Sequence, residues 1–511
     1  MRHSFMSIKS RFVSLSVLSL LMATAPVLAE SLLIRNVSII SDGISGGSTG
    51  NHPQASAAQD VLINNGKIQA IGTKLGQADK QIDASGKYLI PGLIDSHVHL
   101  DGVPGYKGHD AKDESMLQQA RAQMPRSYAY FGFTTVLDLT GDANFIANWN
   151  SVPAGPKAYF CAPVVIPNGY PAVFFGKEGQ FQLKGSQYML YDPAQPDVYP
   201  ASFNKEQHSP EAVVALAKQQ GARCIKVFYE TGFGVQRNLP VPSVKLMKAV
   251  VAEAKQQGLP VFLHGNSQAA YEFALDTKVN TLVHGLWHTH KGAEPEHNHS
   301  KLNRIADLLV KAGIAVQPTI QVLYGEQELL NPAFFQNPQV QHAIPKQLSQ
   351  WYQTEAGQWM NRELAGNFAP AQNPAELYQQ IKQAYQQPLT LVRQMTADLN
   401  QKGAVLQFGS DTPSGPFYSQ FPGINGRWEM DRWLETGLSL SQLFSAMTSG
   451  NAKALGMEGE IGFIKAGLDA DLLLLSSNPL QTVTAYDQIE LVILKGKALQ
   501  RAKLSAAQQQ H

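Results

Sequence analysis

The chain of 511 residues lacks an excess of charge of either sign. Its 41 Lys and Arg residues nearly balance its 40 Asp and Glu residues, which gives a formal net charge of +1. Proteins that bind nucleic acid or an anionic membrane surface through their overall charge are strongly basic, so this balance argues against both kinds of partner. Charged residues make up 16% of the chain and hydrophobic residues 44%, which is typical of a globular protein with a large core. We therefore expect a small molecule or a short peptide as ligand, whereas nothing in the sequence indicates the oligomeric state.

Cysteine is almost absent, because Cys161 and Cys224 are the only two in the chain. Neither has the spacing of a metal site, and both lie in apolar runs that are typical of strands. The default interpretation is a pair of buried thiols that pack as small hydrophobic groups. A disulfide between them is the alternative.

A hydrophobic run long enough to cross a bilayer comfortably is also missing at the start of the chain. Three basic residues precede an apolar stretch over residues 12–25, which is shorter than the roughly 20 residues of a membrane span. Small residues at positions 27 and 29 suit cleavage before Glu30. We predict a signal peptide over residues 1–29, and hence a periplasmic or secreted protein without stable membrane insertion. A retained membrane anchor is the alternative.

Two kinds of pattern divide the remaining chain. Short alternating runs over 30–88 and again over 460–505 predict one composite β-sandwich domain built from both chain ends, with a hairpin turn at residues 64–67. Between them, residues 89–459 alternate apolar strands with amphipathic helices and contain eight strand candidates. The fold class is therefore α/β, with a (β/α)8 TIM-type barrel. A polar, Gln-rich region at about 323–401 predicts a helical insertion after the seventh strand.

Five polar side chains stand where predicted barrel strands end. His97 and His99 close the first strand, and because residues two apart in a strand point to the same face, both rings lie on one side. His264, His284 and Asp411 close the fifth, sixth and eighth strands. The carboxyl ends of barrel strands meet at one face, where the chemistry of such barrels takes place. Imidazole and carboxylate at one edge predict a metal site.

Lys226 lies within the apolar run of the fourth predicted strand, where a charged ammonium would be costly to bury. One interpretation is an ion pair with Asp411. The other is that the amine reacts with CO₂ to form a carbamate, an anion that can bridge two cations.

These motifs resemble those of the amidohydrolase superfamily of metal-dependent hydrolases. The His-x-His pair, Lys226, His264, His284 and Asp411 match the metal ligands of that family one by one, with Lys226 as its carboxylated lysine. The run "GFIKAGLDADL" at 462–472 resembles the returning C-terminal strand of the family. The chain looks nearest to the imidazolonepropionase-like and amidohydrolase-type prolidase branch. It departs from that branch after the third strand, where "PVVIPNGYPAVFFG" replaces a Gly-Gly-His element.

The resemblance implies two divalent metal ions, with zinc favoured by the ligand types, and hydrolysis of a C–N bond in an amide, peptide or cyclic amide by a metal-activated hydroxide. Asp411 would be the catalytic group that moves the proton. Tyr229 and His288 are candidate substrate contacts. The further histidines of this region, His290, His297 and His299, are expected in a polar surface loop. A mononuclear deaminase of the same superfamily and a non-catalytic binding relative remain alternatives.

Overall fold

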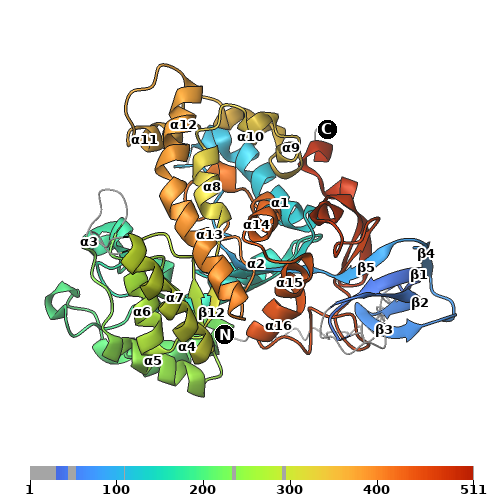
Figure 1. Cartoon of the computed structure of the whole chain (residues 1–511), viewed down its shortest axis with the longest axis horizontal. Helices are drawn as coiled ribbons and strands as arrows, with labels where there is room; N and C mark the ends of the chain where they lie inside the picture. The colour runs from blue at the N-terminus through green and yellow to red at the C-terminus, as the bar shows by residue number, and fades with distance from the viewer. Residues whose placement is uncertain (1–29, 44–52, 109, 233–237, 290–294, 510–511) are drawn as a thin grey trace, which may run out of the picture.

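The structure is a computed structural model that describes residues 30–43, 53–108, 110–232, 238–289 and 295–509. The predicted signal peptide over 1–29 and His290 lie outside the described residues. Two sheets organise the chain, and Figure 1 shows them side by side, with the helices gathered around one of them.

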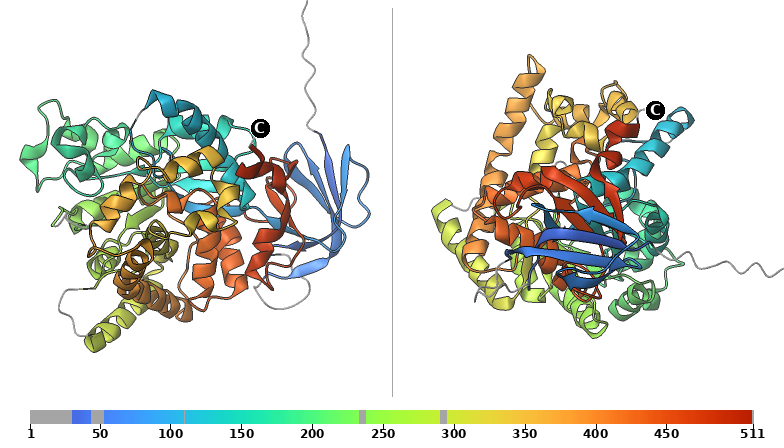
Figure 2. Two further views of the ribbon diagram at one scale, coloured as in Figure 1. Left: turned by 90° about the horizontal axis from the view of Figure 1, so that it is seen from above. Right: turned by 90° about the vertical axis from the view of Figure 1, so that its right-hand side faces the viewer.

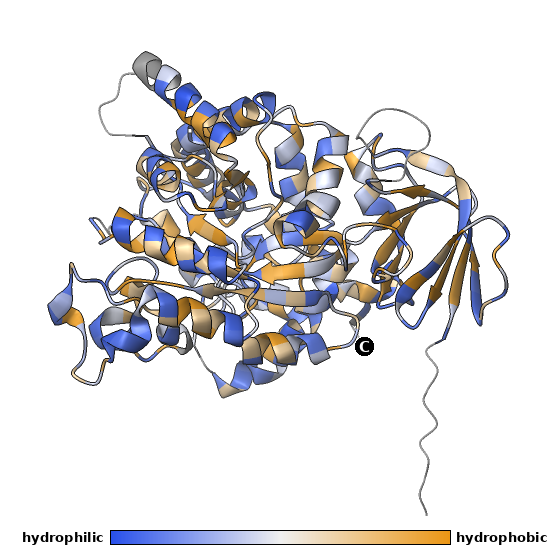
Figure 3. Ribbon diagram, turned by 90° about the horizontal axis from the view of Figure 1, so that it is seen from below, coloured by the Kyte–Doolittle hydropathy of each residue, from blue (hydrophilic) through white to orange (hydrophobic). Residues whose placement is uncertain are grey.

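A parallel sheet of seven strands forms the larger part. Its strands are neighbours in chain order, from β6 to β12: β6 (Leu93–Val98), β7 (Phe133–Asp138), β8 (Lys157–Pro163), β9 (Cys224–Phe228), β10 (Val261–His264), β11 (Thr281–Val283) and β12 (Ala315–Gln317). Helices join successive strands, as parallel pairing requires: α1 (Glu114–Tyr130), α2 (Ala143–Ser151), α4 (Pro210–Gln219), α5 (Val244–Gln256), α6 (Gln268–Thr277) and α7 (Pro295–Ala312). Figure 3 shows these inner strands as largely hydrophobic, which is typical of a parallel sheet covered on both faces.

The segment 405–412 lies between the two edge strands of this sheet. Its backbone bonds to Val316 in β12 on one side and to Ser96 and His97 in β6 on the other, over N···O distances of 2.8–3.2 Å. It contains only isolated bridges and no regular strand, in contrast to the eighth strand expected there. The physical reason lies in the segment itself, because Asp411 adopts a left-handed φ of 53°, which an extended strand cannot accommodate.

The second sheet joins the two ends of the chain. It has eight strands in mixed orientation: β1 (Leu32–Ile40), β2 (Ala55–Asn64), β3 (Lys67–Gly72), β4 (Lys80–Asp83), β5 (Tyr88–Pro91), β13 (Leu472–Leu475), β14 (Ile489–Leu494) and β15 (Lys497–Gln500). Figure 2 shows the N-terminal strands and the C-terminal strands next to each other. The hairpin between β2 and β3 turns at Asn65 and Gly66, both with positive φ, as predicted. The pairing forms one continuous sheet, whereas a sandwich of two sheets was expected.

The region after β12 is helical, as the sequence predicts. It comprises α8 (Gln321–Glu328), α9 (Val340–Ala343), α10 (Lys346–Tyr352), α11 (Trp359–Ala365), α12 (Pro374–Ala384) and α13 (Gln386–Gln401), and the helices α14 (Ile424–Leu434), α15 (Leu440–Ser445) and α16 (Asn451–Ala454) follow segment 405–412. Leu389 and Val392 of α13 pack with Val322 and Leu323 of α8 and with Trp287, just past β11. This apolar cluster holds the insertion against the carboxyl ends of the strands.

Cys161 of β8 and Cys224 of β9 form a disulfide. The two residues are register partners in neighbouring parallel strands, their Cα atoms are 4.4 Å apart, and both are fully buried. The prediction of burial is confirmed, and the default interpretation as free thiols is wrong. The sequence could not predict the bond, because the register of β8 against β9 brings the two sulfurs together. Within the described part of the chain, we find no helix with the length and apolar character needed to span a bilayer.

Candidate active site

A cavity of about 1710 Å³ opens at the carboxyl ends of the parallel strands. Six of the residues that the sequence singles out line it: His97, His99, Lys226, His264, His284 and Asp411. Side chains of α8 and α13 or their flanks, such as Glu326 and Tyr385, close one side of it. The topology thus brings together residues that are more than 300 positions apart in the chain.

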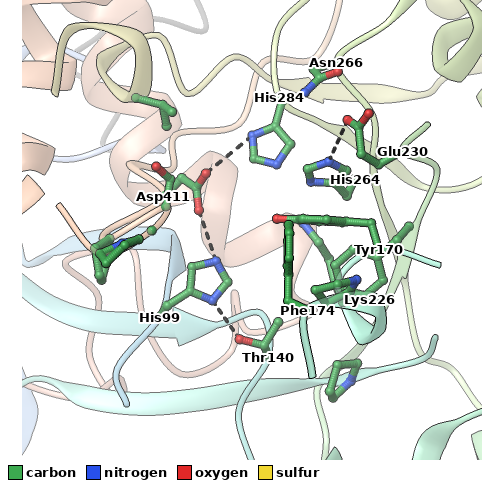
Figure 4. Close-up of a pocket in the computed structure, with 18 of the residues that line it drawn as sticks. His99, Thr140, Tyr170, Phe174, Lys226, Glu230, His264, Asn266, His284 and Asp411 are labelled. Atoms are coloured by element: carbon green, nitrogen blue, oxygen red, sulfur yellow. Dashed lines mark hydrogen bonds and ion pairs between the residues drawn. The ribbon is translucent and has the colours of Figure 1, made fainter. Parts of the chain in front are cut away.

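Asp411 is the centre of the polar cluster (Figure 4). Its Oδ1 lies 3.1 Å from Nε2 of His97 and 3.1 Å from Nε2 of His99, so these two histidines converge on one oxygen. Figure 4 shows the contact between Asp411 and His99. The backbone N–H of Asp411 donates to the carbonyl of His97 at 2.8 Å, which fixes segment 405–412 beside β6. Gly409 is required here, because a Cβ at that position would lie 2.7 Å from Cβ of His97.

His284 joins the cluster from the end of β11. Its Nδ1 lies 3.6 Å from Oδ2 of Asp411 and 2.9 Å from the hydroxyl of Thr319. His284 and Thr319 adopt positive φ values of 79° and 44°, a conformation that costs free energy in residues other than glycine and is often found at functional sites. One donor atom each from His97, His284 and Asp411 lie within 4.8 Å of one another, close enough to bind a single cation together.

Lys226 is 1% exposed and points into the same cavity from β9. Its Nζ makes no hydrogen bond with any described residue, so the ion pair with Asp411 that the sequence left open is not formed. Burial lowers the pKa of the Lys226 amine to about 7, although the charge of Asp411 opposes this shift. A large fraction of the amine is therefore uncharged, and nucleophilic, near neutral pH.

His264 stands next to this cluster. Its ring centre is 4.5 Å from that of His284 and 4.7 Å from that of Tyr170, while its Nε2 lies 3.5 Å from Oε2 of Glu230. The structure therefore brings all six predicted ligands to one cavity, but Lys226 and His264 lie beside the compact group of His97, His284 and Asp411.

Burial sets the protonation of the cluster. It lowers the pKa of His97 to about 3 and lowers the pKa values of His264 and His284 as well, so these rings are neutral at neutral pH and keep a lone pair for a cation. Burial alone would raise the pKa of Asp411, but the adjacent histidines, above all His97, hold it well below its usual range. The carboxylate is thus ionised. For His99, burial lowers the pKa, but the hydrogen bond to Asp411 and the charges of Asp411 and Asp138 together outweigh burial and raise the pKa.

The two predicted substrate contacts differ in position. His288 lines the cavity with an exposed side chain. Tyr229 is not among the described lining residues, because its ring packs against α6, 4.7 Å from that of Phe273. Its neighbour Glu230 faces the cavity instead. The sequence predicted a polar surface loop for His297 and His299, but both residues belong to the first turns of α7.

Sequence reasoning missed several polar residues that hold the histidines. The hydroxyl of Thr140 lies 2.7 Å from Nδ1 of His99, and Thr319 contacts His284 in the same way. Both residues follow strand ends, and that position was the available signal. Tyr170, which packs on His264, comes from the loop after β8, where no pattern marks it.

Comparison with known proteins finds a family model and curated relatives that are similar to this chain. The model of the Amidohydrolase family matches residues 88–499. A D-hydantoinase of Ralstonia pickettii is 31% identical over 134 residues, which is 25% of this chain and 25% of the relative. A dihydroorotase of Lactobacillus helveticus is 46% identical over 78 residues, which is 15% of this chain and 16% of the relative. The chain thus matches a quarter or less of the length of these curated relatives.

Solved structures share the fold over most of the chain. A Xaa-Pro dipeptidase with bound methionine has a TM-score of 0.59 at 19% identity and covers 92% of this chain and 100% of its own. The ochratoxinase of A. niger has a TM-score of 0.60 at 18% identity and covers 92% of this chain and 96% of its own. The family match extends from β5 to β15 and includes all six predicted metal ligands. This chain therefore belongs to the amidohydrolase family.

Proposed function

We propose that this protein hydrolyses a C–N bond in an amide, peptide or cyclic amide by a metal-activated hydroxide. The observation that carries the proposal is the convergence of the His97, His284 and Asp411 donor atoms within 4.8 Å of one another, in a cavity that Lys226, His264 and His99 also line. The names of two relatives, D-hydantoinase and dihydroorotase, support a cyclic amide as one substrate class. In this proposal segment 405–412 acts as the eighth strand of a (β/α)8 barrel.

The residues present fit two divalent cations. His97, His99, His264, His284 and Asp411 supply nitrogen and oxygen donors, a set that suits zinc. The buried, unbonded amine of Lys226 supplies the remaining ligand after it reacts with CO₂. In that reaction the nitrogen forms a bond to the carbon of CO₂ and releases one proton, which leaves a carbamate anion. Lys226 would thereby change from an uncharged amine without a hydrogen bond to any described residue to an anion whose charge bound cations can balance.

Bound divalent ions would lower the pKa of a water and polarise the substrate carbonyl. Asp411 then accepts the proton of the attacking water and donates it to the leaving nitrogen as the C–N bond breaks. It is suited to this role because it is ionised at neutral pH and held by His97 and His99. Glu326 and Tyr385, from the insertion, line one side of the cavity in which this chemistry would take place.

Metal analysis combined with a hydrolysis assay tests the proposal against its alternatives. We expect about two equivalents of zinc and turnover of at least one class in a panel of peptides, N-acyl amino acids, lactams and cyclic amides. One metal with ammonia release from amino-substituted rings would identify a deaminase. A protein with neither metal nor turnover would be a binding relative.

Replacing the threonines that hold the histidines should weaken metal binding without removing a ligand. Thr140→Val and Thr319→Val keep the side-chain shape but delete the hydroxyls that contact His99 and His284. Loss of such supporting hydrogen bonds costs about 10- to 100-fold in metal affinity or activity. Competition with a chelator measures this change, and Thr390→Val on the exposed face of α13 is the control. Unchanged affinity in both cavity variants would refute the supporting role.

We also propose that the protein is exported. The disulfide between Cys161 and Cys224 supports this, because disulfides persist in oxidising compartments. N-terminal sequencing of the protein from the periplasm or medium should begin at or near Glu30. Recovery of the soluble protein with Met1 still present would contradict export through a cleaved signal peptide.

A further inference from the structure

Each of three consecutive strands is followed by a buried side chain with a polar atom that makes no hydrogen bond to any described residue. These atoms are Oε2 of Glu230 after β9, Nδ2 of Asn266 after β10 and Nε1 of Trp287 after β11. The three residues are 7%, 1% and 8% exposed, and all of them line the cavity. Buried polar groups are almost always hydrogen-bonded in folded proteins. These three atoms, one of which (Oε2 of Glu230) contacts Nε2 of His264 at 3.5 Å without forming a hydrogen bond, therefore indicate a ligand that bonds to them.

Strand register places these side chains together. Phe228 and His264 are register partners in β9 and β10, and Glu230 and Asn266 each follow two residues later. The backbone N–H of Trp287 donates to the carbonyl of Asn266 at 2.8 Å, which ties the third residue to the second. Figure 4 shows Glu230 and Asn266 on the side of the cavity opposite His99. We call Glu230, Asn266 and Trp287 the polar triplet.

The charge of the cavity defines the ligand that the triplet prefers. One oxygen of Glu230 accepts the backbone N–H of Gly232 at 2.7 Å, and the other lies 3.5 Å from Nε2 of His264. Six acidic residues line the described part of the cavity: Asp101, Asp138, Asp142, Glu230, Glu326 and Asp411. Lys226 is the only Lys or Arg among the same described lining residues. A buried carboxylate binds a cation more strongly than it binds a neutral donor, and this preference belongs to Glu230 itself, because the proposed divalent ions would offset the other acidic residues.

We infer that the polar triplet binds a protonated amino group next to the reacting carbonyl, so that the substrates are aminoacyl compounds with a free α-amino group. Glu230 accepts from the ammonium. Asn266 and Trp287 donate N–H groups to an oxygen of the same substrate. Glu230 lies 3.5 Å from His264, so an amino group bound by Glu230 lies close to the predicted metal ligands. In an α-aminoacyl compound only one carbon separates the amino group from the reacting carbonyl, which agrees with this short distance. This inference rests on the proposed function and narrows its substrate class.

Equilibrium binding tests the inference without turnover. Titration calorimetry of the zinc-loaded protein compares L-leucine with 2-hydroxy-4-methylpentanoate, which replaces the ammonium by a hydroxyl and contains no C–N bond. We expect L-leucine to bind about 10- to 100-fold more tightly, the range of one hydrogen bond to a charged group. Glu230→Gln, titrated in its zinc-loaded form, should abolish this preference. Glu253→Gln on α5, the same change outside the cavity, should retain the preference.

Two results would overturn the inference. One is equal affinity of the unmodified protein for the two compounds, and the other is an undiminished preference for L-leucine in Glu230→Gln. Trp287→Phe keeps the aromatic ring but removes the N–H, and it should weaken both compounds by similar factors. Hydrolysis of leucine anilide is assayed separately. Absence of turnover with leucine anilide and with the whole substrate panel, while the binding preference is intact, would contradict the proposed function. Turnover without the preference would contradict only the polar triplet.

Discussion

Replacing His97 by alanine is expected to remove metal and lower the hydrolysis rate by roughly a thousandfold or more, the scale of losing a group that stabilises developing charge. His97 is 1% exposed, lies 3.1 Å from Asp411 and shares the compact group with His284. Its loss therefore removes one of the three donor atoms of that group. Metal content by mass spectrometry and kcat/KM on the best substrate of the panel measure the effect.

A matched control separates loss of the site from loss of the fold. His342→Ala makes the same change far from the cavity, where the ring stacks on Tyr130 and its Nδ1 lies 2.8 Å from the hydroxyl of Ser505. It should retain metal and activity. If His97→Ala also kept full metal occupancy and rate, the polar cluster would be structural.

Replacing Lys226 by alanine should abolish hydrolysis and release part of the metal, because the bridging carbamate can no longer form. Added acetate or propionate should restore part of the rate, since a short carboxylate fits the space that the side chain leaves. Lys157→Ala, at the start of β8, is the control lysine. Anomalous diffraction gives the most direct measurement: two metal peaks and density beyond Nζ are expected. A single peak with an unmodified lysine would refute the carbamate and favour the deaminase alternative.

Lys226→Met should instead stabilise the metal-free protein by about 1–3 kcal/mol, the cost of an unpaired buried polar group. Burial lowers the pKa of Lys226 to about 7, so between this value and the ordinary value of 10.5 the folded state binds fewer protons than the unfolded state. The stability of the unmodified protein therefore rises with pH over this window. The advantage of the variant should be largest below pH 7 and shrink from about pH 7 toward pH 10.5. Denaturant unfolding with chelator in CO₂-free buffer measures it, and a destabilised variant would indicate a structural lysine.

The sequence by itself determined where the chemistry is located. His97 and His99 share a face because strands alternate every two residues, and His264, His284 and Asp411 meet because parallel strands bring their carboxyl ends to one edge. Both rules act through local periodicity and topology, so an apolar run and its terminal residue are sufficient to apply them. The helical insertion and the joining of the two chain ends in one domain followed from composition and patterning in the same way, whereas the pairing of the end strands into one continuous sheet did not.

Only the tertiary structure decided which neighbours each of these residues contacts. The pairing of Cys161 with Cys224 depends on the register of β8 against β9, and the contact of Thr140 with His99 depends on the path of a loop. Past the end of β9, Tyr229 packs against α6 and its neighbour Glu230 lines the cavity. Glu230 therefore takes the place that the sequence predicted for Tyr229. Register, loop path and helix packing arise from contacts between residues far apart in the chain, and no local pattern encodes them.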